Sequence, residues 1–291
     1  MLGIVLVNKA PGITSHDVVD VMRRRFGTRR VGHAGTLDPL ASGLLVVAVG
    51  PATRFLQYLS LEPKEYIADV RFGHATSTYD EEGVPTESGP VPEDLAAALE
   101  AELPAYRGLI QQLPPMYSAV KLNGKPLYTY ARRGEEVERR PRTVHIDALT
   151  IVEAGESTAK LRILCSGGTY VRTLAHDIGM MLKCGAHLTG LVRTQVGRFL
   201  LEAARTIDEV DPEDLMPLSE ALAPMPALTL DEEAERFARD GRTLHLAPEL
   251  VPDNPFVVLL DLRGGIVGIG RVSGLAIHPE CVLPQEASSH V

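Results

Sequence analysis

The chain has 291 residues, of which 45% are hydrophobic and 23% charged, a composition typical of a globular protein with one large domain or two. Its formal net charge of −9 argues, over the whole chain, against a nucleic-acid partner. Three scattered cysteines exclude a disulfide framework, and no run of about 18 apolar residues predicts a membrane helix. The N-terminus lacks the pattern of a signal peptide, so we expect a cytoplasmic protein.

Charge is unevenly distributed along the chain. Residues 1–61 hold seven Lys and Arg against three Asp and Glu, and residues 121–145 again hold seven against three. The acidic excess lies in residues 201–291, with six basic against seventeen acidic side chains. Because charges act over about 8 Å at physiological salt, the two basic segments predict a polyanionic substrate in spite of the net charge.

The first elements are a strand and a helix joined by a turn. Residues 3–7 alternate as in a strand, and residues 8–12 contain the Pro-Gly pair of a turn. Thr14 or Ser15 can cap a helix that runs to about Arg25, since a short oxygen-bearing side chain accepts from the first N–H groups.

Residues 32–43 read Gly-His-Ala-Gly-Thr-Leu-Asp-Pro-Leu-Ala-Ser-Gly and lead into the apolar run 44–49, which predicts a buried strand. Pro39 biases Asp38 toward extended backbone, and the flanking glycines permit tight turns. We therefore expect the Asp38 carboxylate to be held on a fixed turn beside the strand. The alternative is an ordinary aspartate in a turn.

The middle of the chain predicts a series of regular elements. These are a helix over 52–60, a strand over 64–73, a polar loop over 74–90, a helix over 92–103, and strands over 144–152 and 160–165. Tyr66 in the first of these strands has two interpretations. A strand aromatic usually packs in a core, but its flat face and hydroxyl also suit a nucleobase in a pocket.

Residues 121–134 interleave basic and aromatic side chains. Cations suit phosphates and rings suit stacking on bases, so the segment favours RNA binding through Arg132 and Arg133. Helical spacing allows another interpretation, in which Tyr128 and Arg132 form an ordinary surface pair.

Glycines 167 and 168 end a strand, and Thr169 can cap a helix that begins near Val171. Arg172 at this junction is suited to hold a carboxylate such as Asp38 ionised and oriented. The alternative is a surface arginine, which the helix dipole disfavours at an N-terminus. His176-Asp177 indicates hydrolytic chemistry only weakly, because no nucleophilic Ser or Cys is placed beside it.

The last part of the chain predicts a small second domain. Residues 208–226 are acidic and end in Pro-Met-Pro, as a linker does. A helix over 231–240 and strands over 255–261 and 265–271 follow, consistent with a small β-barrel, and residues from about 285 form a tail.

Residues 32–43 resemble the active-site motif of the TruB-type tRNA pseudouridine synthases at twelve contiguous positions. Further segments resemble other motifs of that family. They are the Lys9 turn with Thr14-Ser15, Lys64-x-Tyr66, the Thr-Ser-Thr-x-Asp of 76–80 (Ser77 stands where the family has an acid), Pro114 to Lys121, Tyr128 to Gly134, Gly168 to Thr173, and Gly185 to Thr194. The resemblance covers nearly the whole chain.

The resemblance implies an α+β pseudouridine-synthase fold, with a central mixed, mostly antiparallel sheet flanked by helices. It implies a catalytic domain at residues 1–225, a PUA-like RNA-binding β-barrel at 226–285, and a tail at 286–291. The acidity of the last domain argues against strong RNA binding by that piece.

The function that the resemblance implies is isomerisation of uridine 55 in the T-loop of tRNA to pseudouridine, after the base is flipped out. No cofactor, metal, membrane or obligate protein partner is implied, and we expect a monomer that binds the tRNA T-stem-loop. Asp38 is the expected nucleophile, at C1′ or at the base. The other expected site residues are Arg172, which orients Asp38; Tyr66, which stacks on uracil and accepts a proton; Lys9, Tyr170 and Leu191, which shape the pocket; and His33, which fills the space left by flipped bases.

Two other functions remain compatible with the sequence. One is a non-catalytic protein that binds or folds RNA through the same groove. The other is an RNA-guided synthase that acts on ribosomal RNA within a complex. A glycosidase is disfavoured, because the motif supplies one carboxylate where that chemistry needs two.

Overall fold

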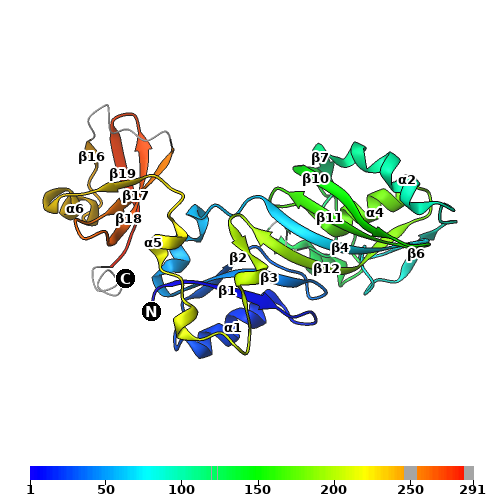
Figure 1. Ribbon diagram of the computed structural model, residues 1–291, viewed down its shortest axis with the longest axis horizontal. Coiled ribbons are helices and arrows are strands. Elements are labelled where there is room, and N and C mark those ends of the chain that lie inside the picture. The colour runs from blue at the N-terminus through cyan, green and yellow to red at the C-terminus, as the bar shows by residue number, and fades with distance from the viewer. Residues whose placement is uncertain (119, 123, 246–253, 285–291) are drawn as a thin grey trace. The chain divides into compact units, whose positions relative to one another are not determined.

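The computed structural model describes residues 1–118, 120–122, 124–245 and 254–284 (Figure 1). It divides into two compact units. The first comprises residues 1–38, 45–60 and 203–291, and the second comprises residues 39–44 and 61–202. The expected tail at 286–291 lies outside the described residues.

The first unit begins with a small sheet in the order β14-β1-β3, with β2 antiparallel on the other side of β3. These strands are β1 (Gly3–Lys9), β2 (Val31–Ala34), β3 (Ser42–Val49) and β14 (Arg205–Thr206). Helix α1 (Ser15–Arg25) begins at a capping box, in which Thr14 and Asp17 each accept from the other's backbone N–H. The expected helix is therefore confirmed, with Thr14 as its cap.

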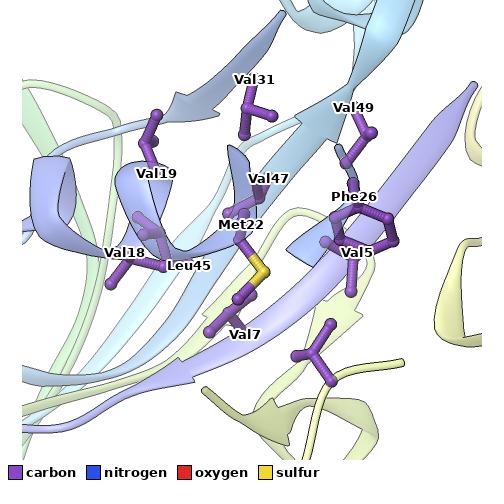
Figure 2. Close-up of a cluster of buried hydrophobic side chains, with 11 residues drawn as sticks. Val5, Val7, Val18, Val19, Met22, Phe26, Val31, Leu45, Val47 and Val49 are labelled. Carbon is purple, nitrogen blue, oxygen red and sulfur yellow. The ribbon is translucent and has the colours of Figure 1, made fainter. Parts of the chain in front are cut away.

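The core of this sheet is a cluster of aliphatic side chains between α1 and the strands (Figure 2). Val18, Val19 and Met22 recur at helical spacing on α1 and are at most 2% exposed. They face Val5 and Val7 of β1 and Leu45, Val47 and Val49 of β3 (Figure 2). The packing of this apolar stripe fixes α1 on the strands that precede and follow the Asp38 loop.

The remainder of the first unit is a five-stranded sheet in the order β15-β17-β18-β19-β16. Its elements are β15 (Ala227–Thr229), α6 (Glu232–Arg239), β16 (Leu244–His245), β17 (Phe256–Leu260), β18 (Ile266–Ser273) and β19 (Ala276–Val282). Asp231 caps α6 by accepting from the Ala234 N–H at 2.8 Å. The expected helix and two strands of this region are confirmed. Short connecting elements complete the unit, namely η1 (Gly50–Tyr58), η4 (Pro212–Asp214) and α5 (Leu218–Ala221).

The second unit is an antiparallel sheet in the order β12-β4-β11-β10-β7. The strands are β4 (Lys64–Phe72), β7 (Gly108–Gln112), β10 (Arg142–Ala154), β11 (Thr158–Cys165) and β12 (Ala186–Val196). Alternate residues of β4, from Tyr66 to Phe72, are buried, as expected for a strand with one covered face. Helices α2 (Leu95–Glu102) and α4 (Val171–Met181) cover that face, and β12 also pairs in parallel with Ser42 and Gly43 at the start of β3.

Smaller elements lie between these strands. They are the hairpin β5 (His74–Thr76) and β6 (Pro85–Ser88), the 3₁₀ turn η2 (Leu103–Tyr106), the hairpin β8 (Lys121–Leu122) and β9 (Lys125–Pro126), α3 (Leu127–Ala131), β13 (Phe199–Leu200) and η3 (Leu201–Ala203).

The α+β class with mixed but mostly antiparallel strand pairing is confirmed. Two local predictions are wrong, since the polar segment 74–90 contains the β5–β6 hairpin and the helix expected over 52–60 is the 3₁₀ helix η1. The strands β7 and β12 are elements that the sequence analysis does not predict. Among the described residues no helix is long and apolar enough to cross a membrane.

Candidate active site

The backbone of Leu37, the residue before Asp38, is held in place by the side chain of Ser15 in α1. The Leu37 N–H donates to Ser15 Oγ at 2.9 Å, and Ser15 Oγ donates to the Leu37 carbonyl at 3.1 Å. Ser15 is 2% exposed, so water does not compete for these two bonds. The half-buried Asp38 therefore follows a fixed backbone position at the N-terminal end of α1, an attachment that the sequence does not predict.

Lys9 is brought to the same end of α1. It lies at the end of β1, is 0% exposed, and its Nζ donates to the Ala10 carbonyl at 3.0 Å and the Ile13 carbonyl at 2.8 Å. These bonds close the turn that leads into the helix. His33 lies on β2 opposite Val47. Within the first unit, Lys9 and Asp38 thus share one end of α1, and His33 lies five residues before Asp38.

Arg172 lies in the first turn of α4 and is 5% exposed, so its interpretation as a surface arginine is wrong. Its Nη1 donates to Asp80 Oδ2 at 3.0 Å and to the Thr78 carbonyl at 3.1 Å, and its Nη2 donates to the Tyr117 carbonyl at 2.9 Å. The guanidinium therefore holds the β5–β6 loop and the Tyr117 segment together. Pairing of Arg172 with Asp38 stays a prediction.

Asp80 is the acidic partner of Arg172, and the sequence alone does not indicate this pairing. It is 4% exposed, and its Oδ1 accepts from the Thr78 hydroxyl and from the Glu82 N–H at 3.2 Å. Both carboxylate oxygens are thus hydrogen bonded. The signal in the sequence was Thr76 and Thr78 at alternate positions before Asp80, because hydroxyls two and four residues upstream can bond to the aspartate side chain and backbone.

Tyr66 and Leu191 lie on adjacent strands and share a face of the sheet. Tyr66 on β4 is opposite Arg193 on β12, and Leu191 is opposite Ala68, two residues further along β4. Tyr66 and Leu191 are each 8% exposed. The structure therefore brings together the side chain expected to stack on uracil and one of those expected to shape the pocket, and their roles stay predictions.

Arg193 is a buried cation that sequence reasoning missed. It is 1% exposed, and its Nε donates to the Leu44 carbonyl at 2.8 Å. A Cβ on Gly43 would lie 2.4 Å from the Arg193 carbonyl oxygen, so the backbones of β3 and β12 touch here. This contact fixes the strand that follows the Asp38 loop.

Tyr170 is the residue immediately before α4. Its N–H donates to Gln112 Oε1 at 3.0 Å, and Gln112 Nε2 donates to the Tyr170 carbonyl at 3.3 Å. Gln112 is 1% exposed at the end of β7. The amide clamp fixes the start of the helix that carries Arg172, so Tyr170 and Arg172 are positioned together.

Arg132 and Arg133 follow α3 and are exposed. The Arg132 guanidinium lies 5.4 Å from the centroid of the Tyr128 ring, whose residue is 40% exposed. The alternative of a Tyr128–Arg132 surface pair is therefore confirmed. Because both groups face solvent, the pair also offers a cation and a ring to a nucleic acid.

Two further groups bear on the chemistry. Burial raises the pKa of the Cys165 thiol to about 11, so this thiol is protonated at neutral pH and is no nucleophile. Burial, with Arg193 nearby, lowers the pKa of Lys64, two residues before Tyr66. Among the described residues no group of three His, Cys, Asp or Glu side chains could hold a metal ion.

Two family models match adjacent parts of the chain. The "TruB family pseudouridylate synthase (N terminal domain)" model matches residues 23–171, and the "tRNA pseudouridylate synthase B C-terminal domain" model matches residues 172–228.

Curated relatives match most of the chain and carry the name tRNA pseudouridine synthase B. The protein of Caldanaerobacter subterraneus subsp. tengcongensis is 40% identical, over 96% of this chain and 98% of the relative. The protein of Thermobifida fusca is 45% identical, over 90% of this chain and 95% of the relative. The protein of Burkholderia mallei is 43% identical, over 96% and 95%.

Solved structures share the fold over almost the whole chain. A Cbf5-Nop10-Gar1 complex contains a chain that matches with a TM-score of 0.71 and 27% identity, over 98% of this chain and 86% of that one. An archaeal box H/ACA sRNP Nop10-Cbf5 complex contains one with a TM-score of 0.71 and 25% identity, over 99% and 88%.

Proposed function

The chain belongs to the TruB family of pseudouridylate synthases, and on that premise we propose that it isomerises uridine 55 in the T-loop of tRNA to pseudouridine. The observation that carries the proposal is the Asp38 loop. It holds the full twelve-residue motif, and Ser15 fixes the residue before the carboxylate. A carboxylate on a rigid support is suited to nucleophilic catalysis.

The proposed reaction needs no redox partner, because substrate and product are isomers. The Asp38 carboxylate attacks C1′ or the base, the N1–C1′ bond breaks, and the uracil turns in its pocket. A C5–C1′ bond then forms, the bond to Asp38 breaks so that the carboxylate is regenerated, and the proton on C5 passes to a base, for which Tyr66 is the proposed acceptor. N1 of the turned uracil takes up a proton, so substrate and product have the same composition. Before this reaction the target uridine must rotate out of the stacked bases of the T-loop, so that its uracil can enter the pocket.

The other site residues support this chemistry in the proposal. Arg172 orients Asp38, Tyr66 stacks on the uracil, and Leu191, which shares a face of the sheet with Tyr66, shapes the pocket. Tyr170 and Lys9 shape the pocket, and His33 fills the space that the flipped bases leave. Arg132 and Arg133 bind phosphates, for which their exposure is suited.

The relatives named as acting on tRNA support a free tRNA as substrate. We propose that this chain acts as a cytoplasmic monomer on bare tRNA without a protein partner, although the structural neighbours are chains of Cbf5 complexes. We also propose that residues 1–225 hold the catalytic machinery and that residues 226–285 form a PUA-like domain.

The test is tritium release from a tRNA transcript that carries 5-tritiated uridine. The purified wild-type chain is expected to release tritium, and a transcript with cytidine at position 55 is expected to release none. Asp38→Asn is expected to lower the rate at least a thousandfold, since a nucleophile contributes several kcal/mol of barrier and about 1.4 kcal/mol is a factor of ten.

The matched control is Asp208→Asn, an exposed aspartate on the same unit, which is expected to retain the wild-type rate. More than a few per cent of the rate in Asp38→Asn contradicts the nucleophile assignment. If the purified chain is inactive on bare tRNA but active on ribosomal RNA with a guide, the guided synthase is the right function. If Asp38→Asn preserves every activity on RNA, the protein is a non-catalytic RNA binder.

A further inference from the structure

Two aromatic rings outside the described site stack between the β5–β6 loop and α4. The Tyr79 and His176 ring centroids are 3.9 Å apart, and the ring planes differ by 17°. Tyr79 is the residue before Asp80, and His176 lies one helical turn after Arg172. The stack and the Asp80–Arg172 ion pair therefore connect the same loop to the same helix, one turn apart.

The backbone at Tyr79 is in the left-handed region, with φ of 65°, which a residue with a side chain rarely adopts. Hydrogen bonds fix the loop on both sides of this turn. The Leu188 N–H donates to the Tyr79 carbonyl at 3.0 Å, and the Glu81 N–H donates to the Leu188 carbonyl at 3.0 Å. This strained turn aims the Asp80 carboxylate at Arg172, so an interaction that favours Tyr79 in this conformation also favours the ion pair.

The His176 ring stacks on Tyr79 and lies within electrostatic range of the Glu87 carboxylate. Its Nδ1 is buried and, within the described part of the chain, has no hydrogen-bond partner. Burial lowers the pKa of His176 below its ordinary value in spite of the nearby Glu87 carboxylate, which acts in the opposite direction, so the neutral imidazole is favoured at pH 7. A neutral imidazole parallel to a phenol contributes through its flat face, a role that another aromatic ring can take over.

We propose that Tyr79 and His176 are positioning residues, whose stack holds Asp80 on Arg172 and thereby keeps the Arg172 guanidinium oriented for catalysis. The catalytic part of this inference rests on the proposed function. The structural part of the inference is the energetic coupling of the stack to the ion pair. This part does not depend on the proposed function.

The kinetic test compares variants that lose a ring with variants that keep one. His176→Ala and Tyr79→Gly are expected to lower kcat for tRNA about tenfold with less than a twofold change in KM. Tyr79→Gly is informative because glycine accepts the left-handed backbone, so its defect reports the ring and not the strain. His176→Phe and Tyr79→Phe keep the stack and are expected to recover at least half of the wild-type kcat. His16→Ala, an exposed histidine of α1, is the control.

A double-mutant cycle in urea unfolding tests the coupling without any activity. His176→Ala is expected to lower the folding equilibrium constant at least fivefold more in the wild type than in the Asp80→Asn background. Additive effects overturn the proposal, as does an unchanged kcat in His176→Ala or a loss in His176→Phe as large as in His176→Ala. If the wild type makes no pseudouridine yet the cycle shows coupling, the proposed function fails while the coupling stands.

Discussion

Arg172 is surrounded by acceptors that match its planar donors. One carboxylate and two backbone carbonyls, from Asp80, Thr78 and Tyr117, accept from its two terminal nitrogens. A lysine has a single ammonium on a flexible stem and cannot reach three acceptors in this fixed pattern. The residue type is therefore set by the geometry of three acceptors, from two chain segments, that meet at one guanidinium.

Asp177, the neighbour of His176 on α4, gives a prediction at the scale of one side chain. Burial raises its pKa to about 6, above the usual value near 4 of an unfolded chain. Between about pH 4 and 6 the folded protein binds a proton more readily than the unfolded one, so this group makes stability fall as pH rises through that window.

Asp177→Asn is therefore expected to raise the free energy of unfolding at pH 7 by about 1 kcal/mol, a value discounted for the partial exposure of the carboxyl. Below pH 4 the gain is expected to vanish, because the wild-type carboxyl is then protonated in both states. Urea titrations of both proteins at pH 4 and pH 7 measure this difference. An equal gain at both pH values would contradict the assignment to ionisation.

Some features around the candidate site were predictable from the sequence because their signals are local. Asp38 precedes Pro39 in a turn segment that begins with Gly35, and Thr14 caps α1 by a pattern of four residues. The Asp80–Arg172 pair joins positions 92 residues apart, and Arg193 meets Leu44 across 149 residues. No local pattern encodes such contacts, so the partners of Arg172 and the burial of Arg193 could be found only in the structure.

At the scale of elements, α4 lies against the start of β12 with no room for a side chain between them. A Cβ on Gly179 would lie 2.2 Å from the Ala186 backbone nitrogen. The helix that carries Arg172 thus packs at Gly179 directly against the backbone of β12. A side chain at position 179 would force the helix further from the sheet.

Gly179→Ala is expected to destabilise the protein by about 1–3 kcal/mol. Helix propensity alone favours alanine by about 1 kcal/mol, so the sign of the effect tells which term is larger. Thermal or urea unfolding measures it, with Met181→Ala, at a 53% exposed position of the same helix, as a control expected within about 0.5 kcal/mol of wild type. A stabilised Gly179→Ala protein would show that the helix moves freely on the sheet.

The elements that sequence reasoning missed have a common physical cause. Segment 74–90 is rich in polar and turn residues, and its β6 strand is exposed throughout, so it lacks the alternating apolar pattern of a half-buried strand. In β12, bulges near Leu188 and Arg193 interrupt the alternation, and a buried arginine occupies a core position. The helix α1 has an unbroken apolar stripe and was predicted to within a residue at each end.

For the whole molecule, the distribution of charge matters more than its sum. The chain carries a net charge of −9, yet residues 121–145 have an excess of four positive charges. Because charges act over about a Debye length, a polyanion at this segment is attracted by the local excess of positive charge and does not respond to the sum over the chain alone.

Replacing Arg132 and Arg133 with glutamate, singly and together, is expected to weaken tRNA binding in steps. Each lost phosphate contact lowers the slope of log Kd against log salt by about 0.7–0.9. Fluorescence titrations from 50 to 200 mM salt measure this slope, and Arg263→Glu, an exposed position in the acidic region, controls for net charge. A slope that is the same for all variants would exclude both arginines from the tRNA interface.

The Asp80–Arg172 pair also limits how this chain can diverge. Both side chains are buried, and replacing either one alone leaves the opposite charge buried without its partner, at a cost of about 3–5 kcal/mol, a substantial part of the about 5–15 kcal/mol by which domains are stable. In related sequences, a substitution at position 80 is therefore expected to require a compensating substitution at position 172, and the reverse. The two positions are expected to be inherited as one unit, however far the surrounding loop drifts.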